Sequence, residues 1–512
     1  MAKKTSIIVV ISIVIIVISL IISIYLPNKK AIDEKIEDNS VSYYLLKKGE
    51  KFGVINGSGD VVIKPEYGEI IIPNPHRAVF MCKTDKENKI LNDKNEEIFK
   101  KYENIEAIEL TNVITESAYE KNVLKYEQNG KFGLLGIDGT VIVEAKYDEI
   151  SSLGYKEGEI LVKENNKYGI INDKGYQIIK NIYDSIVSDQ YYCTEDGYKK
   201  SGYIVCNITS DGYRYGYYDY SGSKILEAEY NQVLRLTEVT NKNDIYLIAA
   251  KNGQYGVFIN NNKIINTQYQ SISYDKMMGL FIVERTGQYG AINEKGIEIL
   301  KPEYSEIQIN GIYMYTKKDE EQKVFDRTGK EIDIPFNTII QATSNSEYYI
   351  KIEQDETENY SILNSNFEEI FEQKYKYIEY IYGKYFIATN EEDKSGIIDS
   401  EGNTILDFKY DLIQTIKDKN IIQAMNFETD ITEIYSNELN KTIELENINI
   451  QTLDNYIKVY NENEEYYLDN SGNKIEDEEK LKTIQESNAV LRIKNFKRVT
   501  YGVEQYYYIE EN

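Results

Sequence analysis

A set of five positions recurs along the chain at constant offsets. An aromatic residue is followed directly by Gly, by a second Gly at offset seven, by Tyr at offset fifteen and by Ile or Val at offset eighteen. Tyr168, Gly169, Gly175, Tyr183 and Ile186 form one such copy. Because self-similarity at a fixed spacing is typical of tandem repeats, the chain is expected to be an array of small units that bury their apolar faces against one another.

The copies differ in completeness. Five complete copies comprise Phe52, Gly53, Gly59 and Tyr67; Phe132, Gly133, Gly139 and Tyr147; Tyr168, Gly169, Gly175 and Tyr183; Tyr215, Gly216, Gly222 and Tyr230; and Tyr289, Gly290, Gly296 and Tyr304. Two further copies are altered: Tyr255, Gly256 and Tyr269, with Asn262 at the second glycine position, and Gly396, Gly402 and Tyr410, with Ser395 in place of the aromatic. Weaker copies lie near 88–102, 322–336, 360–375, 434–445 and 465–475.

Each copy predicts short β-strands. Residues 168–179 form a hairpin in which Asn172 begins a type I turn and Gly175 supplies a positive φ. The glycine after the aromatic allows another backbone or ring to approach closely. A third strand is expected around the second Tyr, followed by a fourth apolar run. Three or four strands fill each period of about 33 to 47 residues, which indicates an all-β fold of tandem β-meander repeats.

The arrangement of these meanders has two alternatives, an open superhelix or a propeller-like ring. Unit lengths vary and no terminal strand obviously closes a ring, so we favour the open array. About ten to twelve repeats are expected over 45–481, and residues 482–512 are expected to form an irregular strand pair that caps the array.

An apolar segment precedes the repeats. Residues 7–26 carry no charge and are almost entirely aliphatic, and about 20 helical residues span the bilayer core. The run is longer than the apolar part of a signal peptide, and no small-residue cleavage site follows it, so a transmembrane signal anchor is favoured over a cleaved leader. Residues 1–6 then form a short basic cytoplasmic tail, 27–44 a charged stalk, and the repeats are placed outside the cell membrane.

The repeat resembles a known family. The Lys-aromatic-Gly opening, the turn that ends in Gly, and the Lys-Pro-Glu-Tyr segments at 64–67 and 301–304 look like the bacterial WG repeat, also called the KWG repeat. The Trp that names the family is Phe or Tyr in the aromatic copies here. The resemblance implies an all-β repeat protein, often at the cell envelope, without a common activity. We expect the smaller aromatic to wedge between neighbouring meanders.

Composition excludes several classes of partner and site. The net charge of −26 disfavours nucleic acid, because phosphate backbones are repelled. His76 is the only histidine and is expected in an exposed loop, so histidine triads and multi-histidine metal sites are not available in one chain.

The acidic turns at 399–403 and 469–473 could offer calcium ligands, but the hairpin turn already explains them. Cys82, Cys193 and Cys206 indicate buried free thiols, with a pair between the last two as the alternative.

These observations favour binding over catalysis. We predict a membrane-anchored, externally displayed repeat scaffold for a protein or cell-wall polymer, with no enzymatic activity and no cofactor. Clustered tyrosines at 191–192, 213–220 and 506–508 are candidate ligand contacts, because Tyr anchors ligands with little loss of entropy. The alternative is an envelope glycan hydrolase, which would require a cleft lined by closely spaced carboxylates.

Overall fold

A computed structural model describes residues 43–509, apart from 85–87, 103, 111–118, 155–156, 194–196, 417–419, 453–455, 488–491, 494–495 and 502–503. The described residues form twelve small sheets, numbered here in chain order, and the all-β prediction is confirmed. Neighbouring strands pair antiparallel with one exception, described below. The array begins at Tyr43, two residues before the predicted boundary. The predicted tail and transmembrane segment lie outside the described residues, as does the stalk up to residue 42.

The first six sheets contain the following strands. Sheet 1 holds β1 (Tyr43–Lys48), β2 (Lys51–Asn56) and β3 (Val61–Tyr67); sheet 2 holds β4 (Glu69–Ile71), β5 (Phe80–Lys83) and β6 (Asn88–Leu91); sheet 3 holds β7 (Asn104–Glu109), β8 (Tyr119–Gln128), β9 (Lys131–Gly136) and β10 (Val141–Tyr147). Sheet 4 holds β11 (Glu149–Ser152), β12 (Ile160–Glu164), β13 (Lys167–Ile171) and β14 (Gln177–Tyr183); sheet 5 holds β15 (Ser185–Cys193), β16 (Gly197–Thr209), β17 (Gly212–Asp219) and β18 (Lys224–Tyr230); sheet 6 holds β19 (Gln232–Leu236), β20 (Tyr246–Lys251), β21 (Gln254–Ile259) and β22 (Asn262–Tyr269).

The remaining sheets continue the series. Sheet 7 holds β23 (Ser271–Asp275), β24 (Leu280–Arg285), β25 (Gln288–Asn293) and β26 (Glu298–Tyr304); sheet 8 holds β27 (Glu306–Asn310), β28 (Tyr313–Lys318), β29 (Glu321–Phe325) and β30 (Glu331–Ile332); sheet 9 holds β31 (Thr338–Ala342), β32 (Tyr349–Gln354) and β33 (Glu358–Leu363). Sheet 10 holds β34 (Tyr377–Tyr382), β35 (Tyr385–Thr389), β36 (Ser395–Asp399) and β37 (Thr404–Tyr410); sheet 11 holds β38 (Leu412–Ile416), β39 (Ile421–Asn426), β40 (Ile431–Tyr435) and β41 (Lys441–Glu446); sheet 12 holds β42 (Asn449–Thr452), β43 (Ile457–Tyr460) and β44 (Glu465–Leu468).

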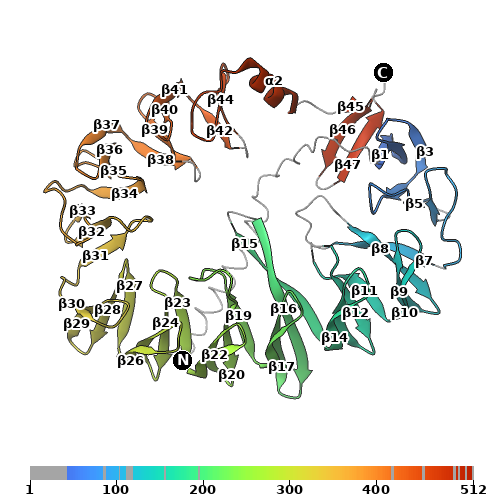
Figure 1. The fold of residues 1–512 in the computed structure, drawn as a ribbon, viewed down its shortest axis with the longest axis horizontal. Coiled ribbons are helices and arrows are strands. Elements are labelled where there is room, and N and C mark those ends of the chain that lie inside the picture. Colours follow the sequence, from blue (N-terminus) through green and yellow to red (C-terminus); the bar gives the residue numbers. More distant parts are fainter. Residues whose placement is uncertain are drawn as a thin grey trace.

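The sheets follow one another around a ring, like the blades of a propeller (Figure 1). After sheet 12 the chain forms helix α2 (Glu478–Ser487) and the strands β45 (Arg492–Ile493), β46 (Phe496–Tyr501) and β47 (Glu504–Ile509). β47 pairs in parallel with β1, so that Leu46 lies opposite Tyr507 and sheet 1 contains both ends of the described chain. The preference for an open array was therefore wrong. The C-terminal strands join the first sheet instead of forming a separate cap.

The sequence repeat is offset from the sheets by two strands. Tyr168 lies in β13, the third strand of sheet 4, and Tyr183 ends the fourth strand, whereas Ile186 belongs to the first strand of sheet 5. The predicted third strand around the second Tyr is therefore divided between two sheets. Each sequence repeat therefore runs from the third strand of one sheet to the first strand of the next, and its constant offsets extend across the boundary between the two sheets.

The core is distributed between successive sheets. One typical cluster joins Ile170, Ile179 and Tyr183 of sheet 4 to Tyr203 and Val205 of sheet 5, and these five side chains are at most 3% exposed. Comparable clusters lie between most neighbouring sheets. A single four-stranded sheet cannot bury both of its faces, so each sheet depends on its neighbours, as expected for repeat proteins.

None of the helices in the described part of the chain has both the length and the apolar character needed to cross a bilayer. The predicted anchor at 7–26 is not part of that region.

Candidate functional site

The hairpin turn of the repeat has the predicted geometry. Asn172 Oδ1 accepts the backbone N–H groups of Lys174 and Tyr176 at 3.0 and 2.9 Å, and the Gly175 N–H donates to the Asn172 carbonyl. The second glycines all have φ between 76° and 86°; they are Gly59, Gly139, Gly175, Gly222, Gly296 and Gly402. A side chain in this conformation is strained, because Cβ crowds the backbone, and glycine avoids that strain.

The same turn identifies the weaker copies. In each weak copy, the side chain of the first turn residue accepts a backbone N–H group two residues further on, and the fourth turn residue has a positive φ. The first and fourth residues are Asn92 and Asn95, Asp326 and Gly329, Asn364 and Phe367, Ser436 and Leu439, and Asp469 and Gly472. The turns at 399–403 and 469–473 belong to this set. Asp399 Oδ1 accepts the N–H groups of Glu401 and Asn403. Oδ2 of Asp399 contacts Lys384 at 3.2 Å, so both carboxylate oxygens are engaged by nitrogen donors.

The glycine after the aromatic contacts a bulge in the fourth strand. In sheet 4, Tyr168 pairs with Tyr183 and Ile170 with Ile179, so one residue of β13 lies opposite three of β14 between these pairs. The extra residues push a carbonyl toward Gly169, where a Cβ atom would lie 2.7 Å from the Ile179 oxygen. Equivalent backbone contacts of 2.4 to 2.7 Å occur at Gly53, Gly133, Gly216, Gly256, Gly290 and Gly396. The close approach expected at this position is therefore present.

The two aromatic positions have different surroundings. The second Tyr is at most 4% exposed in five copies, where it packs between adjacent sheets: Tyr147, Tyr183, Tyr230, Tyr269 and Tyr410. Tyr67 and Tyr304 are half-buried. The first aromatic is half-buried in all six copies that have one: Phe52, Phe132, Tyr168, Tyr215, Tyr255 and Tyr289. The second Tyr is thus the more deeply buried of the two. The first aromatic packs against the margin of the same cores between sheets, at Phe52, Phe132, Tyr168 and Tyr255.

A lysine of the strand that precedes the first aromatic covers its ring in several copies. The ammonium groups of Lys47, Lys125 and Lys163 lie 5.3, 5.5 and 5.0 Å from the ring centroids of Phe52, Phe132 and Tyr168. Such cation–π contacts add about 0.5–1 kcal/mol at exposed sites.

The side chain of the residue after the second Tyr accepts a backbone hydrogen bond from the next sheet, a role that the sequence pattern did not reveal. Asn231 Oδ1 accepts the N–H of Asn252, and Gln270 Oε1 accepts that of Gly287, both in the turn between the second and third strands of the next sheet. Aspartate at this position also binds the lysine that opens the repeat, as in Lys394 and Asp411 at 2.6 Å. A polar residue recurs here in most copies, and aligning the copies would have revealed it.

Sheets 8 and 9 are neighbours in which the repeat pattern is weak, as it also is in the three-stranded sheets 2 and 12. Gln322 occupies the position of the first aromatic and Lys323 that of the glycine after it. The fourth strand β30 has only two residues, compared with seven in β26 of sheet 7. Sheet 9 has no fourth strand, and isolated bridges from Tyr360 to Tyr375 and from Leu363 to Glu369 stand in its place.

A groove of about 420 Å³ lies where these two irregular sheets meet. Five of its lining side chains are amides: Gln308, Asn310, Gln322, Asn337 and Gln354. Two are aromatic, Tyr315 and Phe336, with ring centroids 5.5 Å apart at an angle of 82°. No lining residue carries a charge, in a chain that is 28% charged. The groove is therefore a neutral region on an acidic molecule, and it is not the carboxylate-lined cleft that a glycan hydrolase would require.

Acidic neighbours orient three of the amides. The side-chain nitrogens of Gln308, Asn337 and Gln354 donate to Glu306, Asp355 and Glu358 at 2.5, 2.7 and 3.0 Å. This leaves the three amide oxygens available as acceptors. Within the region that the structure describes, Asn310 and Gln322 make no side-chain hydrogen bond, so each offers a donor group and an acceptor to the groove.

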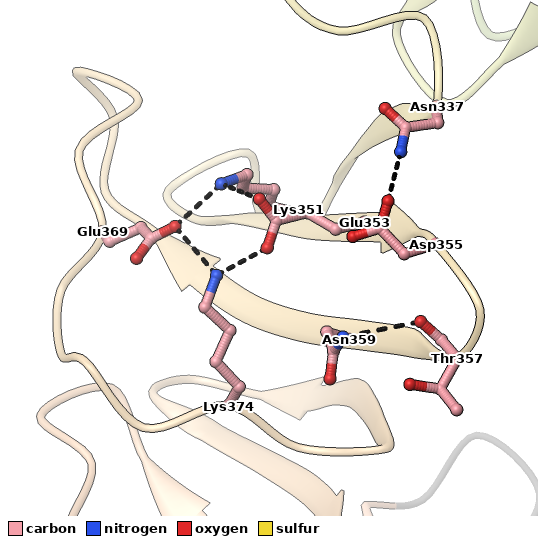
Figure 2. Close-up of polar contacts among 8 residues, drawn as sticks. All are labelled: Asn337, Lys351, Glu353, Asp355, Thr357, Asn359, Glu369 and Lys374. Atoms are coloured by element: carbon pink, nitrogen blue, oxygen red, sulfur yellow. Dashed lines mark hydrogen bonds and ion pairs between the residues drawn. The ribbon is translucent and has the colours of Figure 1, made fainter.

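An ion-pair network stabilises sheet 9 beside the groove (Figure 2). Lys351 Nζ lies 2.7 Å from Glu353 and 2.9 Å from Glu369, and Lys374 Nζ lies 2.6 and 3.4 Å from the same two carboxylates. Hydrogen bonds from the lysines hold the pKa of Glu353 and of Glu369 below the ordinary value. The network fastens the segment after β33 to β32 and so replaces the missing fourth strand. Figure 2 also shows Asn337 directed toward Asp355.

The other sequence candidates are dispersed. In β17 the adjacent tyrosines face opposite sides as predicted: Tyr217 packs in the core shared with sheet 6, and the Tyr218 hydroxyl contacts that of Tyr183 in sheet 4. Tyr213 is 59% exposed, and Tyr220 just after the strand is 66% exposed. The clusters at 191–192 and 506–508 lie in β15 and β47. His76 is exposed in the loop after β4. Cys82 and Cys206 are buried free thiols, which excludes the alternative pairing of Cys206.

The described residues contain no group of three or more His, Cys, Asp or Glu side chains arranged to hold a metal ion. One carboxylate is nevertheless deeply buried. Glu120 in β8 is 1% exposed and accepts the Gly158 N–H, and desolvation by burial raises its pKa to about 7. This contact joins sheet 3 to the loop between β11 and β12 of sheet 4.

Comparison with known proteins supports the repeat. Residues 52–72, 132–168 and 396–425 match the family described as WG containing repeat, so the resemblance found in the sequence is confirmed. No curated protein matches the chain.

Several solved structures share a distant likeness. The crystal structure of a eukaryotic initiation factor is 12% identical and covers 72% of this chain and 96% of its own, with a TM-score of 0.27. Kluyveromyces lactis Hsv2 is 9% identical over 41% of this chain and 79% of its own, with a TM-score of 0.22. The extracellular domain of the putative hybrid two component system BT4673 from B. thetaiotaomicron is 10% identical over 86% and 77%, with a TM-score of 0.20. These superpositions are poor, and no functional conclusion follows from them.

Proposed function

We propose that this WG-repeat protein is a membrane-anchored scaffold, displayed outside the cell, that binds a protein or cell-wall ligand and catalyses no reaction. The observation that carries the proposal is the neutral groove between sheets 8 and 9, which forms where the repeat loses its aromatic and its fourth strand. Five amides line this groove, and a few polar groups that set the orientation of a ligand are typical of a ligand site.

The ring supports a binding role in a second way. Twelve sheets hold one another in place through distributed cores, so a site between two sheets has a rigid frame on both sides. Rigid frames favour affinity, because little conformational freedom is lost on binding. The carboxylates described above serve in turns, in ion pairs and in contacts between sheets, which supports a role without catalysis.

Membrane topology is the first test of the proposal. An epitope tag is placed after Asn512, and intact cells are treated with protease. Loss of the tag without lysis is the expected result and supports external display. Protection of the tag until the cells are lysed would overturn the external placement.

Ligand binding is tested separately with purified cell walls that retain their attached proteins. The full-length chain in nanodiscs is expected to sediment with the walls, and Gln322→Tyr is expected to reduce the bound fraction by about tenfold, because the ring fills the groove. Gln254→Tyr, an equivalent change at an exposed position of sheet 6, provides the control. Equal sedimentation of all three chains would show that the groove is not the binding site.

A further inference from the structure

We infer that the groove between sheets 8 and 9 binds a segment of neutral glycan. The inference rests on the proposed binding function and adds the chemical class of the ligand. It depends on three properties of the groove: its hydrogen-bonding groups, its aromatic floor and its lack of charge.

The hydrogen-bonding groups match sugar hydroxyls. A hydroxyl both donates and accepts, and a lining of amides offers both functions at short intervals. The oxygens of Gln308, Asn337 and Gln354 remain available as acceptors, because their nitrogens are held by acidic side chains. Asn310 and Gln322 add donors. Three of the five amides are thus oriented before the ligand arrives, which reduces the entropy lost on binding.

The aromatic floor provides an apolar surface for the carbon-bound hydrogens of a sugar ring. Phe336 is half-buried and is the ring that offers this surface. Tyr315 is only 2% exposed and supports Phe336 from the core, and its hydroxyl donates to the Thr338 carbonyl, so the ring is fixed in position. Phe336 packs against it edge to face, and the Lys317 ammonium lies 5.9 Å from the Phe336 centroid. A fixed aromatic pair beside polar side chains is suited to a ligand with both apolar and hydroxylated faces.

The electrostatic setting disfavours anionic ligands. Two of the amides are backed by Asp355 and Glu358, and the chain carries a net charge of −26. Glu306, behind Gln308, is paired with Lys317 at 2.6 Å. A phosphorylated or uronic polymer would be repelled by these carboxylates. The ligand is therefore expected to be uncharged.

The backbone around the groove does not favour a peptide strand. Peptides commonly bind by adding a strand to an exposed sheet edge. Here the edge strand β31 is already covered, because the Ile312 N–H donates to the Ile340 carbonyl at 2.9 Å. A Cβ atom on Gly311 would lie only 2.0 Å from the same oxygen, which shows how closely this loop covers the edge. The recognition groups that remain are side chains from several strands, an arrangement better suited to a sugar than to an extended peptide.

The test uses isothermal titration calorimetry with the full-length chain in nanodiscs, which avoids sugar-based detergents. The neutral probes are chitotetraose, cellotetraose and maltotetraose, and tetragalacturonate and tetra-alanine serve as anionic and peptide comparators. At least one neutral probe is expected to bind. Gln322→Tyr and Asn310→Ala are each expected to raise the dissociation constant of that probe by about tenfold or more, which is the effect of losing one or two hydrogen bonds. The control Gln254→Tyr is expected to change it by about twofold at most.

The outcomes separate this inference from the proposed function. Binding of a neutral probe that is sensitive to Gln322 and Asn310 supports both. Failure of all neutral probes, together with cell-wall sedimentation that still depends on Gln322, overturns the glycan inference and leaves the scaffold function standing. Preference for tetra-alanine or tetragalacturonate overturns it as well. Absence of both probe binding and sedimentation overturns both proposals.

Discussion

Lys167 and Asp184 form an ion pair of 2.7 Å although seventeen positions separate them in the sequence. The second carboxylate oxygen of Asp184 accepts the Ile208 N–H at 2.8 Å. Lys167 lies in sheet 4 and Ile208 in sheet 5, so one aspartate connects the two sheets. The hydrogen bond from Ile208 and the ion pair with Lys167 together hold the pKa of Asp184 below its ordinary value.

Replacement of this aspartate is expected to loosen the contact between the two sheets. Asp184→Ala should lower the free energy of unfolding by about 1 kcal/mol, since it removes a hydrogen bond to a charged acceptor that is partly exposed to solvent. Urea denaturation measures the change. Asp211→Ala is the matched control: its carboxylate is 80% exposed and lies 4.0 Å from Arg214, so its removal should have almost no effect. Equal losses for the two variants would contradict the role assigned to Asp184.

The glycine after the aromatic is expected to be more sensitive to substitution than a glycine needed only for its φ. In Gly290→Ala the new Cβ would lie 2.7 Å from the Leu300 carbonyl oxygen, so the bulge must move. We expect a loss of about 3 kcal/mol or more. Gly287→Ala provides the comparison: its φ is +76° and its surroundings are open, so it should lose only about 1 kcal/mol. Thermal unfolding distinguishes the two, and a smaller effect at Gly290 would contradict the steric explanation.

Much of the fold could be predicted because the repeat encodes local geometry. The turn at Asn172 and Gly175 and the contact at Gly169 follow from backbone sterics, which act within a few residues. The assignment of strands to sheets was less accessible. Tyr183 and Ile186 are three residues apart yet belong to different sheets, and a local pattern does not show where one sheet ends.

Ring closure and the candidate groove could not be read from the repeat for a different reason. Leu46 and Tyr507 pair across nearly the whole chain, and long-range pairing leaves no local signal. The groove arises where the repeat fails, at Gln322, and a weak copy looks like simple divergence until its neighbours are known. An alignment of the copies would not have singled out Gln322, because Asn88, Ser395 and Glu465 occupy the same position in other copies.

Removal of the C-terminal strands is expected to expose β1. A chain that ends at residue 487 lacks β45 to β47, so the edge of β1 loses its parallel partner. Hydrogen exchange of β1 amides, around Leu45 and Leu46, should become faster, because unpaired edge groups exchange with solvent. Amides of β24 in sheet 7 provide the internal control and should be unchanged. Unaltered protection of β1 would contradict closure of the ring by this pair.

The buried carboxylate of Glu120 is expected to make stability dependent on pH. Burial raises its pKa from 4.5 to about 7, so the folded chain binds an additional proton between these values. Because the folded state then binds more protons than the unfolded state, the free energy of unfolding falls as pH rises from about 4.5 to about 7. The loss should approach about 3 kcal/mol above pH 7. Glu157 and Asp173 add repulsion in the same direction, while the Gly158 N–H opposes it.

The pH dependence can be assigned to this residue with two variants. Glu120→Gln cannot ionise, and its amide oxygen can still accept the Gly158 N–H, so the fall in stability between pH 5 and pH 7 should largely disappear. Glu106→Gln is the control, because a hydrogen bond from Lys125 lowers the pKa of Glu106 and places its titration below this range. Urea midpoints measured at pH 5, 6, 7 and 8 give the comparison. If Glu120→Gln keeps the slope of the unsubstituted chain, the dependence has another origin, and the contact between β8 and the Gly158 loop does not control it.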